Sequence, residues 1–250
     1  MQPVRDKFSS QADAYAKFRP TYPAELYAFL FSSVRNKSAA WDCGTGNGQV
    51  AIELAKQFSN VYATDVSEKQ LSHAPSRENI AYFLSRAEHT HFPDDAFDLI
   101  TVAQAIHWFD FDAFYSEVRR VAKPDALLAV WGYGLTTISP EIDALVFDFY
   151  TNVVGKYWDV ERRHIDDAYK SIPFPFRQVQ TPEFNIAQSW KFEHFIGYLN
   201  SWSAVQNCLA AKQVNPVEEF KNMLEQRWNN DEVKLVLFPI FTRIGYIHEG

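Results

Sequence analysis

Short apolar runs alternate with amphipathic segments along the first half of the chain. Five runs have the length and composition of buried strands, and the segments between them carry apolar residues at helical spacing. The predicted strands are 39–43, 60–65, 80–84, 98–103 and 126–131. The predicted helices are 24–34, 50–58, 68–74 and 112–122. Strands that alternate with helices favour parallel pairing, so the pattern predicts an α/β fold.

The alternation of strand-like and helix-like segments ends after Gly132. Residues 140–171, 192–206 and 216–227 have largely helical spacing, whereas 183–188 and 234–247 resemble strands. The sequence therefore predicts a helical cap inserted between the fifth strand and the last two. The run Lys123-Pro124-Asp125 is expected to form the turn that ends the helix before the fifth strand.

Composition and charge narrow the class of protein. The chain has 250 residues, of which 47% are hydrophobic and 16% aromatic, enough for a large core and for an apolar pocket. The formal net charge is −7 and no long Lys/Arg run occurs, which argues against a nucleic-acid substrate. Two distant cysteines, Cys43 and Cys208, make no disulfide framework, and no metal site is expected. The polar N-terminus and the lack of a long apolar run predict a cytoplasmic enzyme that does not associate with membranes.

A glycine-rich turn follows the first predicted strand. The run Trp41-Asp42-Cys43-Gly44-Thr45-Gly46-Asn47-Gly48 precedes a predicted helix. Glycine permits positive φ and the close approach of a ligand, and the start of a helix favours an anionic group such as a carboxylate or phosphate. The spacing is G-x-G-x-G rather than the G-x-G-x-x-G of dinucleotide-binding turns. The alternative is a turn that needs flexible residues for structural reasons alone.

Asp65 ends the second predicted strand, about 20 residues beyond the glycine-rich turn. An acid at this place can accept hydrogen bonds from the hydroxyls of a ribose. Its alternative role is to cap the helix that starts near Glu68. The register with the glycine-rich turn favours the ribose role.

These segments together resemble a known family. WDCGTGNG (41–48), ATD (63–65) and SRAEHTHFPDDAFDLITVAQAIHWFD (85–110) are similar to class I S-adenosylmethionine-dependent methyltransferases. With AYAKFRPTYP (14–23), they resemble the small-molecule branch that includes methyltransferase type 11 and trans-aconitate methyltransferase-like proteins. The resemblance is strong over residues 8–132. It implies a Rossmann-like, mostly parallel seven-stranded sheet with helices on both faces, and S-adenosyl-L-methionine as cofactor.

The resemblance also implies which residues contact the cofactor. Four residues of the glycine-rich turn would hold its amino-acid end, namely Asp42, Gly44, Thr45 and Gly46. Asp65 would bind the ribose hydroxyls and Val66 would pack on the adenine. Ala87 and Glu88 lie where the family contacts the adenine edge, and Gln104 would face the methionine part. One departure is Pro124-Asp125-Ala126, where the family usually has paired glycines; this turn is distant from the predicted cofactor site.

Residues 1–23 are expected to form an N-terminal flap. Tyr15, Phe18, Arg19 and Tyr22 combine aromatic rings with one cation. Such a flap can cover the cofactor through Tyr15 and Arg19, with Arg19 meeting a carboxylate. The alternative is a plain N-terminal cover with Arg19 on the surface.

His107 and Trp108 follow the fourth predicted strand, beside the expected position of the reactive methyl group. They are the candidate substrate-binding residues, and His107 is the candidate general base. The alternative, slightly favoured, is that His107 only orients the substrate or packs against Trp108. A sulfonium methyl is already activated, so the enzyme mainly needs positioning and the exclusion of water, and a carboxylate acceptor needs no base.

The sequence therefore predicts a methyltransferase that transfers a methyl group in line to a small molecule, with carboxylic acids among the candidate acceptors. The chain is expected to be one domain, with a flap at 1–23, a cofactor-binding core at 24–132, a cap and substrate region with one core strand at 133–233 and a final core strand at 234–250. Two alternatives remain open, a non-catalytic methyltransferase-like binding protein and an NAD-dependent oxidoreductase. The glycine spacing and the lack of an evident Tyr–Lys pair disfavour the oxidoreductase.

Overall fold

The computed structural model describes residues 18–248, and within this range eight strands form one sheet. The strands are β1 Ala39–Cys43, β2 Asn60–Asp65, β3 Ile80–Leu84, β4 Phe97–Ala103, β5 Ala122–Tyr133, β6 Arg177–Gln178, β7 Phe184–Lys191 and β8 Val233–Tyr246. Their order is β3-β2-β1-β4-β5-β8-β6, and β7 also pairs with β8. The first five strands are parallel, and β8 runs antiparallel to its three neighbours.

Helices and short helical turns connect these strands. The α-helices are α2 Ala24–Ser33, α3 Gln49–Leu54, α4 Glu68–Ser72, α5 Phe111–Val121, α6 Pro140–Asp148, α7 Arg163–Asp166, α8 Phe192–Asn200, α9 Ser203–Lys212 and α10 Val217–Glu225. The shorter turns are η2 Ile106–Trp108, η3 Phe149–Val153, η4 Gly155–Tyr157 and η5 Val160–Arg162. The predicted α/β fold is confirmed; the sheet has one strand more than the seven expected, the two-residue β6.

Both faces of the sheet are covered. Successive residues of a strand point to opposite faces, so Leu127 and Leu128 of β5 enter different cores. Leu127 packs in the cluster that contains Leu30 of α2, and Leu128 in the cluster that contains Phe114 of α5. This arrangement leaves the carboxyl ends of the parallel strands free to form a site.

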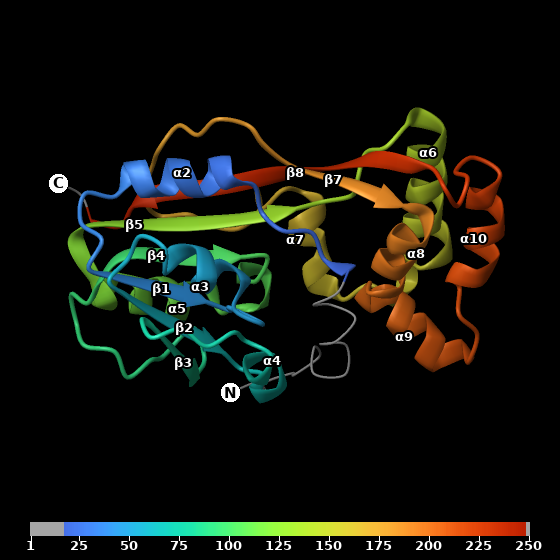
Figure 1. The fold of residues 1–250 in the computed structure, drawn as a ribbon. Helices are drawn as coiled ribbons and strands as arrows, with labels where there is room; N and C mark the ends of the chain where they lie inside the picture. Colours follow the sequence, from blue (N-terminus) through green and yellow to red (C-terminus); the bar gives the residue numbers. More distant parts are fainter. Residues whose placement is uncertain (1–17, 249–250) are drawn as a thin grey trace.

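A third apolar cluster builds the cap from α6 and α8–α10, together with one end of β7 and β8 (Figure 1). Phe149, Phe195, Phe220 and Trp228 are fully or almost fully buried there. The strand β8 is shared by the two parts: residues 240–246 pair with β5, and residues 233–240 pair with β7. The cap is therefore joined to the α/β part by strand pairing as well as by loops.

Some element boundaries differ from the prediction. Lys123-Pro124-Asp125 was expected to be a turn, but it lies inside β5, where the pairing register with β4 shifts between Ala122 and Leu127. A bulge tolerates proline because the extra residues need no ladder hydrogen bond. Residues 192–206 form two helices rather than one, with a break at Ser201 and Trp202. Residues 140–171 are also divided into several short helical pieces.

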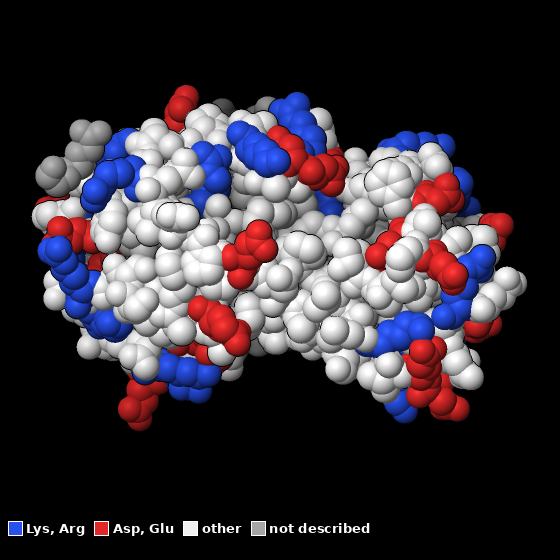
Figure 2. Space-filling model, turned by 90° about the horizontal axis from the view of Figure 1, so that it is seen from above, with Lys and Arg blue, Asp and Glu red and all other residues white. Residues whose placement is uncertain are grey.

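The surface carries charges of both signs. On the face shown in Figure 2, Lys/Arg and Asp/Glu side chains intermix, and the outline narrows between the α/β part and the cap. No helix within residues 18–248 is both long and apolar enough to cross a bilayer.

Candidate functional site

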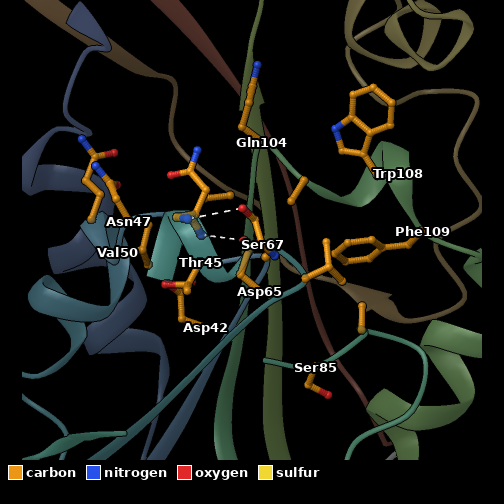
Figure 3. Close-up of a pocket in the computed structure, with 18 of the residues that line it drawn as sticks. Asp42, Thr45, Asn47, Val50, Asp65, Ser67, Ser85, Gln104, Trp108 and Phe109 are labelled. Atoms are coloured by element: carbon orange, nitrogen blue, oxygen red, sulfur yellow. Dashed lines mark hydrogen bonds between the residues drawn. The ribbon is translucent and has the colours of Figure 1, made fainter. Parts of the chain in front are cut away.

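A cleft of about 280 Å³ opens at the carboxyl ends of the parallel strands. The strand order reverses between β1 and β4, which is where open α/β sheets bind ligands. Nine residues that sequence reasoning assigned to the cofactor line this cleft: Asp42, Gly44, Thr45, Gly46, Asp65, Val66, Ala87, Glu88 and Gln104. Figure 3 shows several of them around Asp65. Tyr15, also assigned to the cofactor, lies outside the described residues.

The glycine-rich turn brings backbone close to the loop after β4. Gly44 and Gly46 have φ of 69° and 57°, in the left-handed region that glycine adopts without strain. A Cβ on Gly44 would lie 2.6 Å from the Cβ of Ala105. Any larger residue at position 44 would therefore push apart two segments that line the cleft.

Asp42 is a buried carboxylate at the end of β1, only 1% exposed. Burial raises its pKa from 3.8 to about 6, although the hydroxyls of Thr45 and Thr101 donate to it and oppose the rise. Two hydroxyl donors do not fully replace water around a charge. A cationic group bound in the cleft would favour its ionised form.

Asp65 connects two segments of the cleft. Its Oδ2 accepts a hydrogen bond from the backbone N–H of Gly46 at 2.8 Å, and its Oδ1 accepts one from the N–H of Ser67 at 2.9 Å (Figure 3). The helix α4 is capped by the hydroxyl of Ser67, which accepts from the N–H of Gln70. Asp65 therefore is not the N-cap of α4, the alternative role considered for it, and it fixes the turn instead.

The loop after β3 carries Ala87 and Glu88 into the cleft. The Glu88 carboxylate accepts hydrogen bonds from the N–H of Asp110 and from Nε of Arg86, both at 3.1 Å. Val66, which is 40% exposed, lines the same cleft. The cleft thus has one apolar wall and one acidic group on the side where the sequence predicts an adenine.

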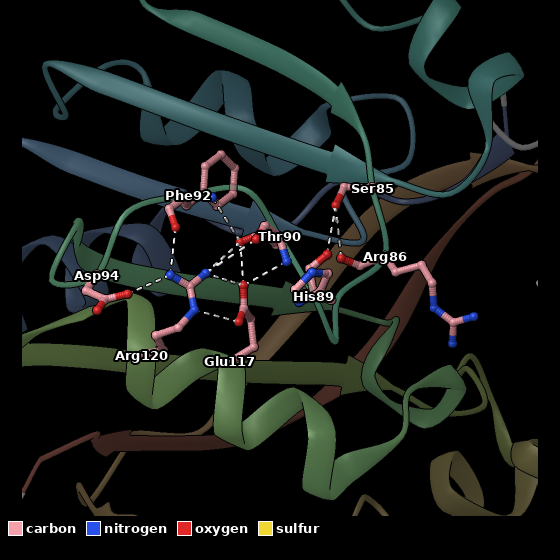
Figure 4. A network of polar contacts seen from close by, with 8 residues as sticks. All are labelled: Ser85, Arg86, His89, Thr90, Phe92, Asp94, Glu117 and Arg120. Atoms are coloured by element: carbon pink, nitrogen blue, oxygen red, sulfur yellow. Dashed lines mark hydrogen bonds and ion pairs between the residues drawn. The ribbon is translucent and has the colours of Figure 1, made fainter. Parts of the chain in front are cut away.

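A polar network holds this loop on α5 (Figure 4). Glu117 is buried and accepts hydrogen bonds from the N–H and hydroxyl of Thr90, and Arg120 donates to both carboxylate oxygens of Glu117. Arg120 also donates to Asp94 and to the carbonyl of Phe92. Burial opposes ionisation of Glu117, but the hydrogen bonds from Arg120 and Thr90 outweigh it and lower its pKa. Charged hydrogen bonds therefore fix the loop from outside the cleft.

Gln104 has a strained backbone at the end of β4, with φ of 56° for a residue that is not glycine. Its side-chain amide forms two hydrogen bonds with the backbone of Tyr133, accepting from the N–H at 2.8 Å and donating to the carbonyl at 3.1 Å. Gln104 lines the cleft, but this amide is engaged with β5. Its contribution to the site is to join the ends of β4 and β5.

A second, smaller hollow of about 70 Å³ adjoins the cleft. The two hollows share Gln104 and Trp108. The smaller one, called the acceptor hollow below, is lined by Arg19, Gln104, His107, Trp108, Trp158, Asp159, Arg162, Ile165, Ser201 and Ser203. It lies between the α/β part and the cap, because η2 contributes one wall and η5 and the start of α9 contribute the other.

Arg19 lines this acceptor hollow and not the cofactor cleft. Its two terminal nitrogens donate to the hydroxyl of Tyr133 and to the carbonyl of Ser201, each at 3.2 Å. The ring of Phe18 lies edge-on to His194 of α8, with 5.3 Å between ring centroids. The last residues of the predicted flap therefore contact both β5 and the cap.

His107 is 7% exposed and borders the acceptor hollow. Its Nδ1 lies 2.9 Å from the hydroxyl of Tyr169, and its ring lies beside Trp108. Burial lowers its pKa to about 3, with the positive charges of Arg162 and His164 adding to the effect. The imidazole is therefore neutral at pH 7.

Sequence reasoning missed residues that reach the site from distant segments. Arg162 and Glu161 come from the cap, and Gln70 from the buried side of α4. Arg162 belongs to the charged run Arg162-Arg163-His164, a pattern more typical of a solvated helix face than of a substrate ligand, yet it borders the acceptor hollow. No spacing rule connects these positions to the glycine-rich turn, so only the tertiary structure brings them together.

Comparison with known proteins supports methyl transfer, the reaction that the sequence predicts. Residues 41–130 match the family described as a methyltransferase domain. A Dictyostelium discoideum protein named as a methyltransferase is 36% identical over 244 residues, which cover 94% of this chain and 93% of that protein. The chain belongs to the class I S-adenosylmethionine-dependent methyltransferases. It is thus an enzyme whose cofactor is S-adenosylmethionine.

Two further similarities agree with this membership. A structure from Anaeromyxobacter dehalogenans, described as a type II methyltransferase, has a TM-score of 0.87 and 37% identity, covering 93% of this methyltransferase and all of the other chain. Methyltransferase cfoB of Aspergillus candidus is 24% identical over 252 residues, covering 89% of this chain and 78% of that protein. The trans-aconitate-like subtype has no support among these proteins.

The residues of the cleft fit S-adenosylmethionine. The side-chain Oε1 of Gln70 is buried, lines the cleft and has no hydrogen-bond partner among residues 18–248. Such an atom fits a donor group of a ligand, because an unpaired buried acceptor is costly. Asp42, with its raised pKa, suits the cofactor's positive charge. Gln70 and Asp42 therefore give the cleft polar groups that match S-adenosylmethionine, the cofactor of the family.

Proposed function

We propose that this methyltransferase methylates a small molecule through a carboxylate that binds in the acceptor hollow. The observation that carries the proposal is the position of Arg162. Its Nε donates to the hydroxyl of Tyr150 at 2.9 Å, and its guanidinium lies over the ring of Trp158 at 4.6 Å from the centroid. No hydrogen bond within residues 18–248 involves its two terminal nitrogens, and such a planar pair matches a carboxylate.

The arrangement of the two hollows supports transfer between them. When bound, S-adenosylmethionine supplies a methyl group on a positively charged sulfur. Gln104 and Trp108 border both hollows, so the acceptor in one is adjacent to the ligand in the other. Arg162 binds and orients the carboxylate, and the buried walls exclude water. One carboxylate oxygen then forms the new O–C bond while the S–C bond breaks and its electron pair stays on sulfur, so no proton has to move.

The cofactor-binding roles are part of the same proposal. Asp42 and the turn at Gly44–Gly46 hold the amino-acid end, Asp65 accepts from the ribose hydroxyls, and Val66, Ala87 and Glu88 surround the adenine. His107 is an orienting residue in this scheme, because a carboxylate acceptor requires no general base. A cytoplasmic location and the absence of a nucleic-acid partner stay predictions from composition.

The experiment is an acceptor screen that measures the formation of S-adenosylhomocysteine. The panel pairs small aliphatic and aromatic carboxylic acids with their amides and alcohols. We expect turnover with acids alone, and Arg162→Gln to raise the acceptor KM about 10- to 100-fold, the effect of losing a charged hydrogen bond. Arg163→Gln is the matched control, since it removes the same charge from the exposed neighbouring position. Turnover with alcohols or amides, and none with acids, would refute the proposal.

A further inference from the structure

A buried contact joins the segment after α7 to η2. The hydroxyl of Tyr169 lies 2.9 Å from Nδ1 of His107, although the two residues are 62 positions apart. Tyr169 is fully buried and His107 is 7% exposed. Tyr169 follows α7, whereas His107 belongs to η2. Tyr169 packs in the apolar cluster of α5 and β5, so the hydrogen bond links two segments of the α/β part beside the acceptor hollow.

The backbone that carries Tyr169 is strained. Ala168 and Tyr169 have φ of 57° and 61°, two consecutive residues in the left-handed region without a glycine. Their N–H groups donate to the carbonyls of Ile165 and His164, which ends α7. Side chains with a Cβ rarely adopt this conformation, and it persists only where the surroundings impose it. The strained turn directs the phenol toward the α/β part.

Other contacts hold Tyr169 in place. Its carbonyl accepts a hydrogen bond from Nη1 of Arg243 at 2.9 Å, and its ring lies edge-on to Phe241 at 4.8 Å between centroids. Both partners belong to β8, the strand that the α/β part and the cap share. The phenol position is therefore set by the sheet as well as by the turn after α7.

The contact leaves one imidazole nitrogen for the acceptor hollow. Nδ1 of His107 is engaged by Tyr169, whereas Nε2 makes no hydrogen bond within residues 18–248. The ring borders the acceptor hollow beside Trp108. In a neutral imidazole, the partner of one nitrogen decides which tautomer forms and hence what the other nitrogen offers.

We propose that Tyr169 is a positioning residue for methyl transfer, holding Nδ1 of His107 so that Nε2 faces the acceptor. The inference rests on the proposed function, because it requires an acceptor beside His107. It assigns the strained turn at Ala168 and Tyr169 a role in the reaction. The substitution Tyr169→Phe keeps the ring and removes only the hydroxyl.

The first test needs no acceptor. We would record the side-chain ¹⁵N shifts of His107, assigned with His107→Gln, in the wild type and in Tyr169→Phe, each with S-adenosylhomocysteine added. The Tyr169→Phe variant is expected to move both ring-nitrogen shifts. The matched control is Tyr115→Phe, which removes another buried hydroxyl, one that donates to the carbonyl of Pro173. Shifts in Tyr169→Phe that stay within those of the Tyr115→Phe control would overturn the inference.

The second test is a double-mutant cycle with the best acceptor from the screen, of whatever class. Tyr169→Phe should lower kcat at least about 10-fold while the KM for S-adenosylmethionine stays unchanged, the pattern of lost positioning. The Tyr169→Phe/His107→Gln double variant should be no slower than His107→Gln, because both changes act through one ring. If the losses of the two single variants add in the double variant, the role of Tyr169 is overturned and the proposed function still stands. Wild-type turnover in His107→Gln would remove His107 from the proposed function as well.

Discussion

Asp65 accepts a hydrogen bond from the backbone N–H of Gly46 at 2.8 Å. The acid at the end of β2 thus holds the glycine-rich turn after β1. The Asp65 carboxylate therefore has two roles, because it holds the turn and is also the predicted ligand of the ribose. The turn and the ribose site should therefore weaken together when the charge is removed.

We expect Asp65→Asn to weaken the binding of S-adenosylhomocysteine by about 1–3 kcal/mol, the range for a hydrogen bond to a charged group. Calorimetric titration measures the change, and circular dichroism shows whether the fold is kept. Glu68→Gln is the control, because it removes an exposed acid from the first turn of α4. Wild-type affinity in Asp65→Asn would rule out the ribose role.

The raised pKa of Asp42 predicts that the free energy of unfolding depends on pH. Because burial raises its pKa from 3.8 to about 6, the folded chain holds this proton more tightly than the unfolded chain does. This group therefore lowers the free energy of unfolding as pH rises from about 4 to about 6, by at most about 3 kcal/mol at pH 8 and about half of that at pH 5.

We expect Asp42→Asn to be more stable than the wild type without ligand, with a larger gain at pH 8 than at pH 5, and to bind S-adenosylhomocysteine more weakly. Urea denaturation at the two pH values measures the gain. Asp125→Asn is the control, since its carboxylate is exposed and remote from the cleft. An equal effect of Asp42→Asn at both pH values would contradict the assigned ionisation.

Gly197 provides the space in which Phe18 sits. A Cβ at position 197 would lie 2.4 Å from Cε1 of Phe18, so Gly197→Ala should displace the ring and loosen the N-terminal segment. We expect faster trypsin cleavage after Lys17 and slower methyl transfer. Gly134→Ala is the control, because nothing lies within 4 Å of a Cβ added there. Equal cleavage and turnover in the two variants would show that the predicted flap does not depend on this contact.

The cofactor cleft was predictable because it is built from local signals. Asp42, the glycines and Asp65 follow directly after strands, and the carboxyl ends of parallel strands meet at one edge of the sheet. Their positions in the sequence therefore determine their proximity. Their contacts were less predictable: Asp65 binds backbone N–H groups, and the Gln104 amide is engaged with Tyr133.

The acceptor hollow was only partly predictable. His107 and Trp108 follow a strand, so their place at the strand end could be inferred. The positions of Arg162 and Tyr169 depend on how η5 and the segment after α7 pack in the folded chain, and the conformation of Ala168 and Tyr169 contradicts the local preference of both residues. The turn predicted at Lys123-Pro124-Asp125 failed for a similar reason, because a bulge in β5 accommodates the proline.

The strand β8 runs without interruption from the cap into the α/β part. Its 14 residues pair with β5 at one end and with β7 at the other, so swinging the cap away would require bending this continuous strand near Ile240, where the two ladders meet. The spacing between the cleft and the acceptor hollow thus depends on the course of one continuous strand. We therefore expect substitutions in the cap helices to reshape the acceptor hollow without moving the cleft, which would allow acceptor specificity to diverge while methyl transfer is retained.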